Sequence, residues 1–173
     1  MTHDSSSTPL TVIAINGPIN SGKSTVGAAL AHLLPDARFI DGDDSDDDDA
    51  HEDLPLAEQW TFALERIRRW IETVASRYLI VAWPLRDSDF AVLRAACERR
   101  TARLVAVTLA PPLDVARAER GGRVLTEWER QRIDEMYAEG YHARAFSDLI
   151  VDTAGLLPAQ SAARIAGWLA EPH

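Results

Sequence analysis

The segment GPINSGKST, residues 17 to 25, combines two glycines with a lysine and several hydroxyl side chains. Gly17, Gly22, Lys23 and Ser24 have the spacing G-x-x-x-x-G-K-[ST], which is typical of a loop that holds phosphate groups. A short β-branched run precedes the segment, and apolar residues at helical spacing follow it. Backbone N–H groups at such a strand-to-helix turn point at phosphate oxygens, and the helix dipole favours their charge. The sequence therefore predicts a polyphosphate site.

The side chains of this segment have chemical roles that fit a polyphosphate. Lys23 supplies a compact ammonium toward the β- and γ-phosphates, and a hydroxyl such as that of Ser24 is a magnesium ligand in loops of this kind. Lys23 is also the only lysine among 18 lysine and arginine residues, which suggests that a guanidinium cannot replace it there. We expect the phosphate contacts to come from Gly17, Asn20, Ser21, Gly22, Lys23, Ser24 and Thr25.

An acidic run follows the second predicted strand, which ends at Phe39 and Ile40. Many proteins with such a phosphate loop place a magnesium-binding acid at the end of a central strand. Here that strand ends in LIVAWP, with no acid. Asp41 and Asp43 are well placed to supply the carboxylate, because the carboxyl ends of parallel strands meet at one edge of the sheet.

The rest of the acidic segment, residues 41 to 53, leaves alternatives open. Its remaining aspartates in the run are Asp44 and Asp46 to Asp49. A calcium loop has acidic or hydroxyl residues at the right spacing here, but Asp46 occupies the position where the sharp turn requires glycine. A solvated, self-repelling loop is the favoured interpretation, and recognition of a cationic acceptor such as an amino sugar is the other.

Strands and helices alternate along the chain. Strands are expected at residues 10–16, before 40, and at 78–83, 103–110 and 148–153. PPLDVARAERGGR predicts a short helix that proline opens and the Gly121–Gly122 pair ends, and Thr126 with Glu129 predicts a capping box for a helix to about Gly140. Right-handed crossovers then give a three-layer α/β fold, with a central five-stranded parallel sheet, helices on both faces and a small lid.

Composition limits the class of protein. The 173 residues are 46% hydrophobic, which suits one domain over residues 10–173 after a disordered tail of residues 1–9. The net charge of −9 gives no support for nucleic-acid binding, and we see neither a membrane span nor a signal peptide, so we expect a cytoplasmic protein, monomeric or homodimeric. Cys97 is the single cysteine and excludes an internal disulfide.

The motif GPINSGKST followed by FIDGDD resembles the small P-loop kinases typified by shikimate kinase and gluconate kinase. The resemblance implies the P-loop NTPase fold, ATP and Mg²⁺, and transfer of the γ-phosphoryl group to a hydroxyl of a small-molecule acceptor. It assigns Asp41 to the magnesium site and Asp43 to the acceptor hydroxyl. The glycine triplet that shikimate kinases carry after the third strand is replaced by AWP, so neither shikimate nor gluconate is the expected acceptor.

Further arginines fit the same resemblance. ARAERGGR resembles the start of a lid, at about residues 117–127, in shikimate and nucleoside monophosphate kinases; Arg120 and Arg123 would stabilise the transferred charge, unless they are solvated residues of an amphipathic helix. AWPLRD resembles an acceptor-side turn in which Arg86 holds an anionic group, although Arg86 is equally consistent with an ordinary surface position. YAEGYHARAFSDLIVDT loosely resembles chloramphenicol phosphotransferase-like proteins.

Two other functions compete with this kinase. A nucleoside monophosphate kinase would need more acceptor-side arginines than Arg86. A nucleotide-binding or switch module without an acceptor would usually keep an acid on the strand that here ends in IVAWP. Trp60 and Trp70, at helical spacing, are expected in the core rather than at a substrate.

Overall fold

The computed structural model of the chain describes residues 9–43 and 54–172. Five parallel strands form one sheet, as predicted, and their order in the sheet is β2-β3-β1-β4-β5. The strands are β1 (Thr11–Asn16), β2 (Ala37–Asp41), β3 (Tyr78–Ala82), β4 (Arg103–Leu109) and β5 (Leu149–Val151). The aspartates from 44 onward and the predicted tail up to residue 8 lie outside the described residues.

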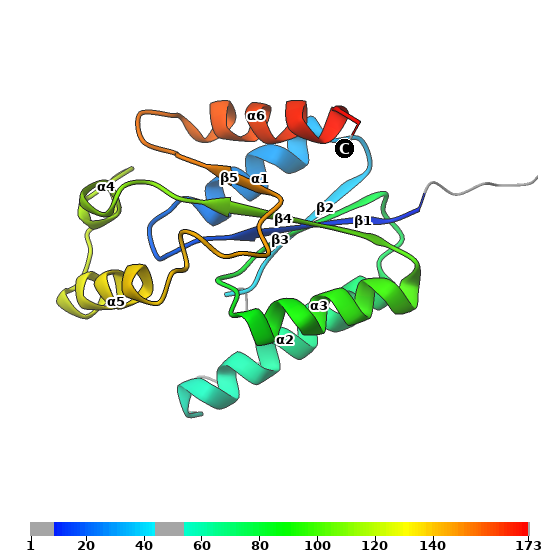
Figure 1. Cartoon of the computed structure of the whole chain (residues 1–173), viewed down its shortest axis with the longest axis horizontal. Helices are drawn as coiled ribbons and strands as arrows, with labels where there is room; N and C mark the ends of the chain where they lie inside the picture. Colours follow the sequence, from blue (N-terminus) through cyan, green and yellow to red (C-terminus); the bar gives the residue numbers. More distant parts are fainter. Residues whose placement is uncertain (1–8, 44–53, 173) are drawn as a thin grey trace, which may run out of the picture.

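Helices cover both faces of this sheet (Figure 1). On one face lie α1 (Lys23–Leu33) and α6 (Pro158–Ala170), and on the other lie α2 (Leu56–Thr73) and α3 (Asp87–Arg100). Two further helices, α4 (Leu113–Arg117) and α5 (Glu127–Ala138), follow β4. The three-layer α/β architecture with a five-stranded parallel sheet is therefore confirmed.

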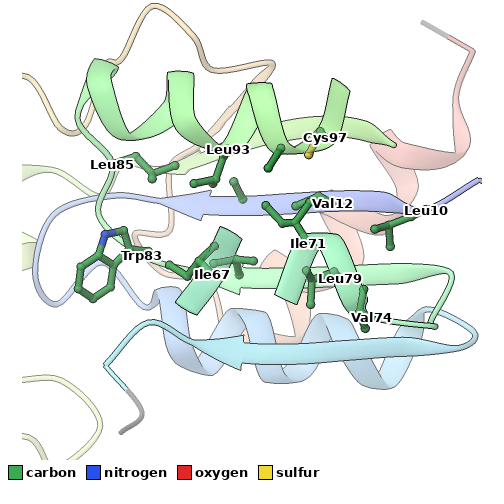
Figure 2. Packing of buried hydrophobic residues seen from close by; sticks show 13 residues of the cluster. Leu10, Val12, Ile67, Ile71, Val74, Leu79, Trp83, Leu85, Leu93 and Cys97 are labelled. Atoms are coloured by element: carbon green, nitrogen blue, oxygen red, sulfur yellow. The ribbon is translucent and has the colours of Figure 1, made fainter. Parts of the chain in front are cut away.

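The side chains of β1 alternate between the two faces of the sheet, so this short strand packs against both helical layers. Successive side chains of a strand point to opposite faces. Val12 and Ala14 contribute to the apolar cluster under α2 and α3, which Figure 2 shows in close view. Ile13 and Ile15 contribute to the cluster under α1 and α6. Since β1 is apolar on both faces, its carboxyl end is held firmly where the phosphate loop begins.

The helix expected to run to the glycine pair is shorter than predicted. It ends at Arg117, and the backbone is extended at Ala118. Gly121 and Gly122 both have positive φ and form the turn of a small hairpin in which Arg120 pairs with Arg123. Two consecutive positive φ values favour a tight hairpin turn, so the glycine pair makes that turn and does not end the helix.

One smaller prediction has a clear outcome. The capping box of α5 is present, since the Thr126 and Glu129 side chains each bond to the other's backbone N–H. Cys97 is buried, and burial raises the pKa of its thiol to about 11, so it is inert at neutral pH. Within residues 9–43 and 54–172, no helix combines the length and the apolar character needed to cross a bilayer.

Candidate active site

The phosphate loop, residues 17 to 25, connects β1 to α1. A Cβ on Gly17 would lie 2.6 Å from the Leu109 carbonyl oxygen, so only glycine fits there. Gly22 has a φ of +97°, which side-chain-bearing residues rarely adopt. The Ser21 hydroxyl is buried and has no hydrogen-bond partner among the described residues. This loop has the features expected of a cradle for an oxygen-rich ligand, because its two glycines have no side chain that would stand over the backbone.

Lys23 lies at the centre of the predicted site residues. Its Nζ donates to the Pro18 carbonyl at 2.8 Å, which folds the side chain back over the loop. Burial lowers the pKa of Lys23 to about 8, Asp43 and Asp41 raise it, and Arg123 lowers it. Lys23, Asp43 and Arg123 line one cleft, and Asp41 accepts a hydrogen bond from the Asp43 backbone, so the structure brings together Lys23, both predicted aspartates and one predicted lid arginine.

The D-G-D segment turns sharply after β2. The Asp43 backbone N–H donates to Asp41 Oδ1 at 3.1 Å. Arg66 of α2, which the sequence did not single out, donates to the Gly42 carbonyl at 2.6 Å. A guanidinium that holds the backbone in this way fixes where the carboxylates of Asp41 and Asp43 stand relative to α2.

The Trp83 ring explains why the residue between Asp41 and Asp43 is a glycine. A Cβ on Gly42 would lie 2.0 Å from Cε3 of Trp83, so the Trp83 ring covers this position. The Trp60 and Trp83 rings lie 4.7 Å apart between centroids. Trp60 and Trp70 do contribute to the core, as predicted, but both also line the cleft beside Lys23.

Asn16, at the end of β1, is a buried polar residue that the sequence analysis missed. Its amide donates to Thr108 Oγ1 and to the Tyr141 carbonyl, both at 3.0 Å. Its Oδ1 accepts from the Leu85 backbone at 2.8 Å. Asn16 therefore ties β1 to β4, to the segment after α5 and to the turn after β3. Its partners are remote in sequence, and only its place before Gly17 could have drawn attention to it.

Arg86, the predicted acceptor-side arginine, lines the cleft and is already paired. Its guanidinium makes two contacts of 2.9 Å with Asp89, which is buried, and lies 4.7 Å from the centroid of the Trp60 ring. The Trp60 indole donates to the same carboxylate at 3.1 Å. The pairing with Asp89 raises the pKa of Arg86 further above neutrality. Its predicted contact with an anionic group stays a prediction.

The two predicted lid arginines lie on different sides of their hairpin turn. Arg123 lines the cleft and forms an ion pair with Glu129, whose pKa is lowered by its bond from the Thr126 backbone and by Arg123. Arg120 is not part of the cleft lining; it donates to the Thr153 carbonyl at 3.3 Å. Thr153 in turn donates to the Ser21 carbonyl at 3.2 Å. Arg120 thus lies beside the phosphate loop, and Arg123 lies toward the acidic residues.

These elements surround a cleft of about 1400 Å³. One end holds Lys23, Asp43 and Arg123, and the walls come from α2, the turn after β3 and α5. The volume exceeds that of a typical small-ligand pocket.

The residues present fit a magnesium–nucleotide complex. Ser24 is exposed at the start of α1 and Asp41 ends β2, so a hydroxyl and a carboxylate are available near Lys23 as oxygen ligands. Among the described residues no group of three or more histidine, cysteine, aspartate or glutamate side chains could hold a metal ion by itself. This donor set suits an ion that takes few protein ligands and shares phosphate oxygens, as Mg²⁺ does.

The lowered pKa of Lys23 predicts a pH dependence of nucleotide binding. Below a pH of about 8 the ammonium is charged, and above it the free protein loses that charge. Bound phosphates favour the charged form, so we expect nucleotide binding in that range to take up a proton and the affinity to fall as pH rises. Calorimetry in buffers of different ionisation enthalpy measures this uptake. Lys23→Gln serves as the control, and proton-free binding above a pH of about 8 in the unaltered protein would contradict the assignment.

In the ligand-free protein, the titration of Lys23 affects folding stability in the opposite direction to nucleotide affinity. The Lys23 pKa in the folded state lies below its ordinary value of 10.5. The unfolded chain therefore binds the proton more tightly than the folded chain does. This group lets the free energy of unfolding rise as pH increases through about 8.

Comparison with known proteins adds information about the fold. No protein-family model and no curated protein matches the sequence. The APS kinase CysC of Mycobacterium tuberculosis, solved with AMPPNP and APS, is similar in structure, with a TM-score of 0.71 and 19% identity over 94% of this chain and 99% of that one. A gluconokinase from Sinorhizobium meliloti 1021 has a TM-score of 0.66 and 22% identity, over 94% and 96% of the two chains.

A shikimate kinase from Acinetobacter baumannii, solved with shikimate, is similar as well. Its TM-score is 0.57 with 18% identity, over 94% of this chain and 93% of that chain. Both families named for the motif resemblance are thus among the similar structures. The chain therefore has the fold of the small P-loop kinases, which its two sequence motifs had predicted.

Proposed function

We propose that the protein is an ATP-dependent kinase that transfers the γ-phosphoryl group to a hydroxyl of a small-molecule acceptor. The observation that carries the proposal is that Lys23, Asp43 and Arg123 line one cleft, with Asp41 hydrogen-bonded to the backbone of Asp43. Phosphoryl transfer needs positive charges that bind the phosphate groups, next to a carboxylate that binds the acceptor hydroxyl. The nucleotide-binding neighbour APS kinase and the small-molecule kinases of the same fold are consistent with this function.

The phosphate end of the site stabilises charge on the transferred group. We assign the β- and γ-phosphates to the backbone of the phosphate loop and to the Lys23 ammonium. Ser24 and Asp41 would hold Mg²⁺, which neutralises phosphate charge when it is bound. Binding of phosphate draws the Lys23 ammonium away from the Pro18 carbonyl, its partner at 2.8 Å in the free protein.

The acceptor end orients the attacking hydroxyl. Asp43 lines the cleft beside Lys23, and a carboxylate there accepts the hydrogen bond of the acceptor hydroxyl. As the phosphorus–oxygen bond to the acceptor forms and the bond to ADP breaks, the hydroxyl proton passes to Asp43. Of the two predicted lid arginines, Arg123 lines the cleft. To stabilise the transferred phosphoryl group, its guanidinium must leave Glu129 and bind phosphate oxygens.

Release of ADP from Mg-ATP tests the proposal. The acceptor panel contains polyols, amino sugars, nucleosides, nucleoside monophosphates and hydroxylated antibiotics, and Lys23→Ala provides the blank. We expect at least one class to raise the rate well above the acceptor-free level. A protein that binds Mg-ATP but loses phosphate at one slow rate, whatever is added, would instead be a nucleotide-binding module.

A further inference from the structure

Tyr141, in the segment after α5, lines the cleft although the residue is only 1% exposed. Buried tyrosines usually have a hydrogen-bond partner for their hydroxyl. Among the described residues the Tyr141 hydroxyl has none, since the contacts of Tyr141 are made by its backbone and its ring. Its oxygen is also not one of the unpaired polar atoms that the protein seals from solvent. The small exposure of Tyr141 therefore includes an unpaired hydroxyl that is open to the cleft.

Three contacts hold Tyr141 in position. Its backbone N–H donates to the Met136 carbonyl at 3.0 Å, and its carbonyl accepts from the Asn16 amide, also at 3.0 Å. The Arg144 guanidinium covers the ring, with 4.3 Å between Cζ and the ring centroid. A polar group on a ring that is already held loses little conformational entropy when it binds a ligand. The hydroxyl of Tyr141 is therefore preorganised for recognition.

The same contacts place Tyr141 beside the predicted acceptor-side turn, residues 83 to 86. Asn16, which binds the Tyr141 carbonyl, also accepts from the backbone of this turn at 2.8 Å. Arg144, which covers the ring, lies 4.0 Å from Asp87 at the start of α3. Three residues of the turn line the cleft together with Tyr141. The hydroxyl thus belongs to the side of the cleft where the acceptor is predicted to bind.

Tyr141 keeps its proton at neutral pH. Burial raises the pKa of its phenol above the ordinary value, and Glu139 raises it further. A protonated phenol donates one hydrogen bond and can accept others. Its natural partner is an oxygen of a hydroxyl, an ether or a carbonyl group.

We propose that the Tyr141 hydroxyl donates a hydrogen bond to a second oxygen of the acceptor, distinct from the hydroxyl that Asp43 orients. The inference rests on the proposed kinase function and narrows its substrate class. The acceptor then carries at least two oxygen functions, as polyols, sugars and nucleosides do, and an alcohol with a single oxygen is a poor substrate. Tyr141 is in this role a specificity-determining residue that touches the acceptor away from the reacting atoms.

Tyr141→Phe removes this hydroxyl and keeps the ring. The probe is the compound of the acceptor panel that gives the highest rate of ADP release. We expect its KM to rise about tenfold, kcat to stay within about twofold and the KM for Mg-ATP to be unchanged. Calorimetry on protein loaded with Mg-AMPPNP measures the same loss as an affinity. The midpoint of thermal unfolding should not fall, because the hydroxyl has no partner to lose among the described residues.

Tyr137→Phe is the matched control. Tyr137 is partly buried, but its hydroxyl donates to the Pro111 carbonyl, and Tyr137 is not among the described residues that line the cleft. This variant loses a hydrogen bond within the protein, so its unfolding midpoint should fall by about 2–4 °C. Its affinity for the acceptor should be unchanged. The two tyrosine variants are thus expected to differ in opposite ways.

Analogues of the same acceptor that each lack one oxygen identify the group that Tyr141 binds. One analogue should bind the unaltered protein about tenfold more weakly than the parent compound. It should bind Tyr141→Phe as tightly as the parent compound does, because the interaction that it lacks is already absent from that variant.

Three results would overturn the inference. These are an unchanged acceptor affinity in Tyr141→Phe, an equal loss of affinity for Mg-ATP, or an unfolding midpoint that falls as it does in Tyr137→Phe. Failure of the kinase proposal is separable, since a panel compound would then bind the loaded protein without raising ADP release, and calorimetry would still test Tyr141. If no panel compound binds, both proposals are wrong.

Discussion

Lys23→Ala is expected to abolish phosphoryl transfer, with a fall in turnover of roughly a thousandfold or more. The ammonium is the cation of the phosphate loop itself, and it stands among Asp41, Asp43 and Arg123. Without it, those two carboxylates would repel the incoming phosphates with less compensation. Turnover is measured as acceptor-dependent ADP release, once the panel has identified an acceptor.

Lys23→Arg separates the need for charge from the need for shape. A planar guanidinium on a longer side chain does not reproduce a compact ammonium that folds back to the Pro18 carbonyl, so we expect turnover to stay low. Thermal unfolding of both variants checks that the fold is intact. Substantial activity in Lys23→Ala would mean that another cation holds the γ-phosphate, and the assignment of the site would be wrong.

Asp43→Asn is expected to lower turnover by roughly a hundredfold to ten-thousandfold while nucleotide binding survives. The amide has nearly the same shape as the carboxylate but cannot take the acceptor proton. The turn should persist, because it is the backbone N–H of Asp43 that donates to Asp41. Steady-state turnover and calorimetric affinity for Mg-AMPPNP measure the two effects separately.

Asp41→Asn is the matched comparison for that variant. Asp41 is assigned to the metal, so its replacement should weaken Mg-nucleotide binding, and raising the magnesium concentration should recover part of the affinity. Two results would contradict the division of roles between the two aspartates. One is full turnover in the Asp43→Asn variant, and the other is an equal loss of nucleotide affinity in both variants.

The phosphate loop and the sheet could be predicted because their signals are local. A strand that is apolar on both faces shows itself in a few consecutive residues, as YLIVA of β3 does. Gly17 and Gly22 are required by backbone geometry at the very positions that the motif specifies. The D-G-D segment was found for a related reason, since parallel strands bring their carboxyl ends to one edge.

The supports of the site could not be predicted, because they join residues far apart in the chain. Nothing near Asn16 indicates that its amide contacts Thr108 and the Tyr141 carbonyl. Arg66 resembles any other arginine of an amphipathic helix until α2 is placed beside β2. The dual role of Trp60, in the core and in the cleft, has the same origin, since periodicity identifies the inner face of a helix but not where the core ends.

Asn20 ties the predicted lid to the phosphate loop. Its amide donates to the carbonyls of Ala116 at 2.8 Å and Ala118 at 2.9 Å, which ties the end of α4 to the phosphate loop. The capping box at Thr126 fixes the other side. Only residues 119 to 125 lie between these anchors, and each newly ordered residue costs about 1–2 kcal/mol of conformational entropy. In the proposed kinase, closure of the predicted lid over a nucleotide would therefore move only this short segment.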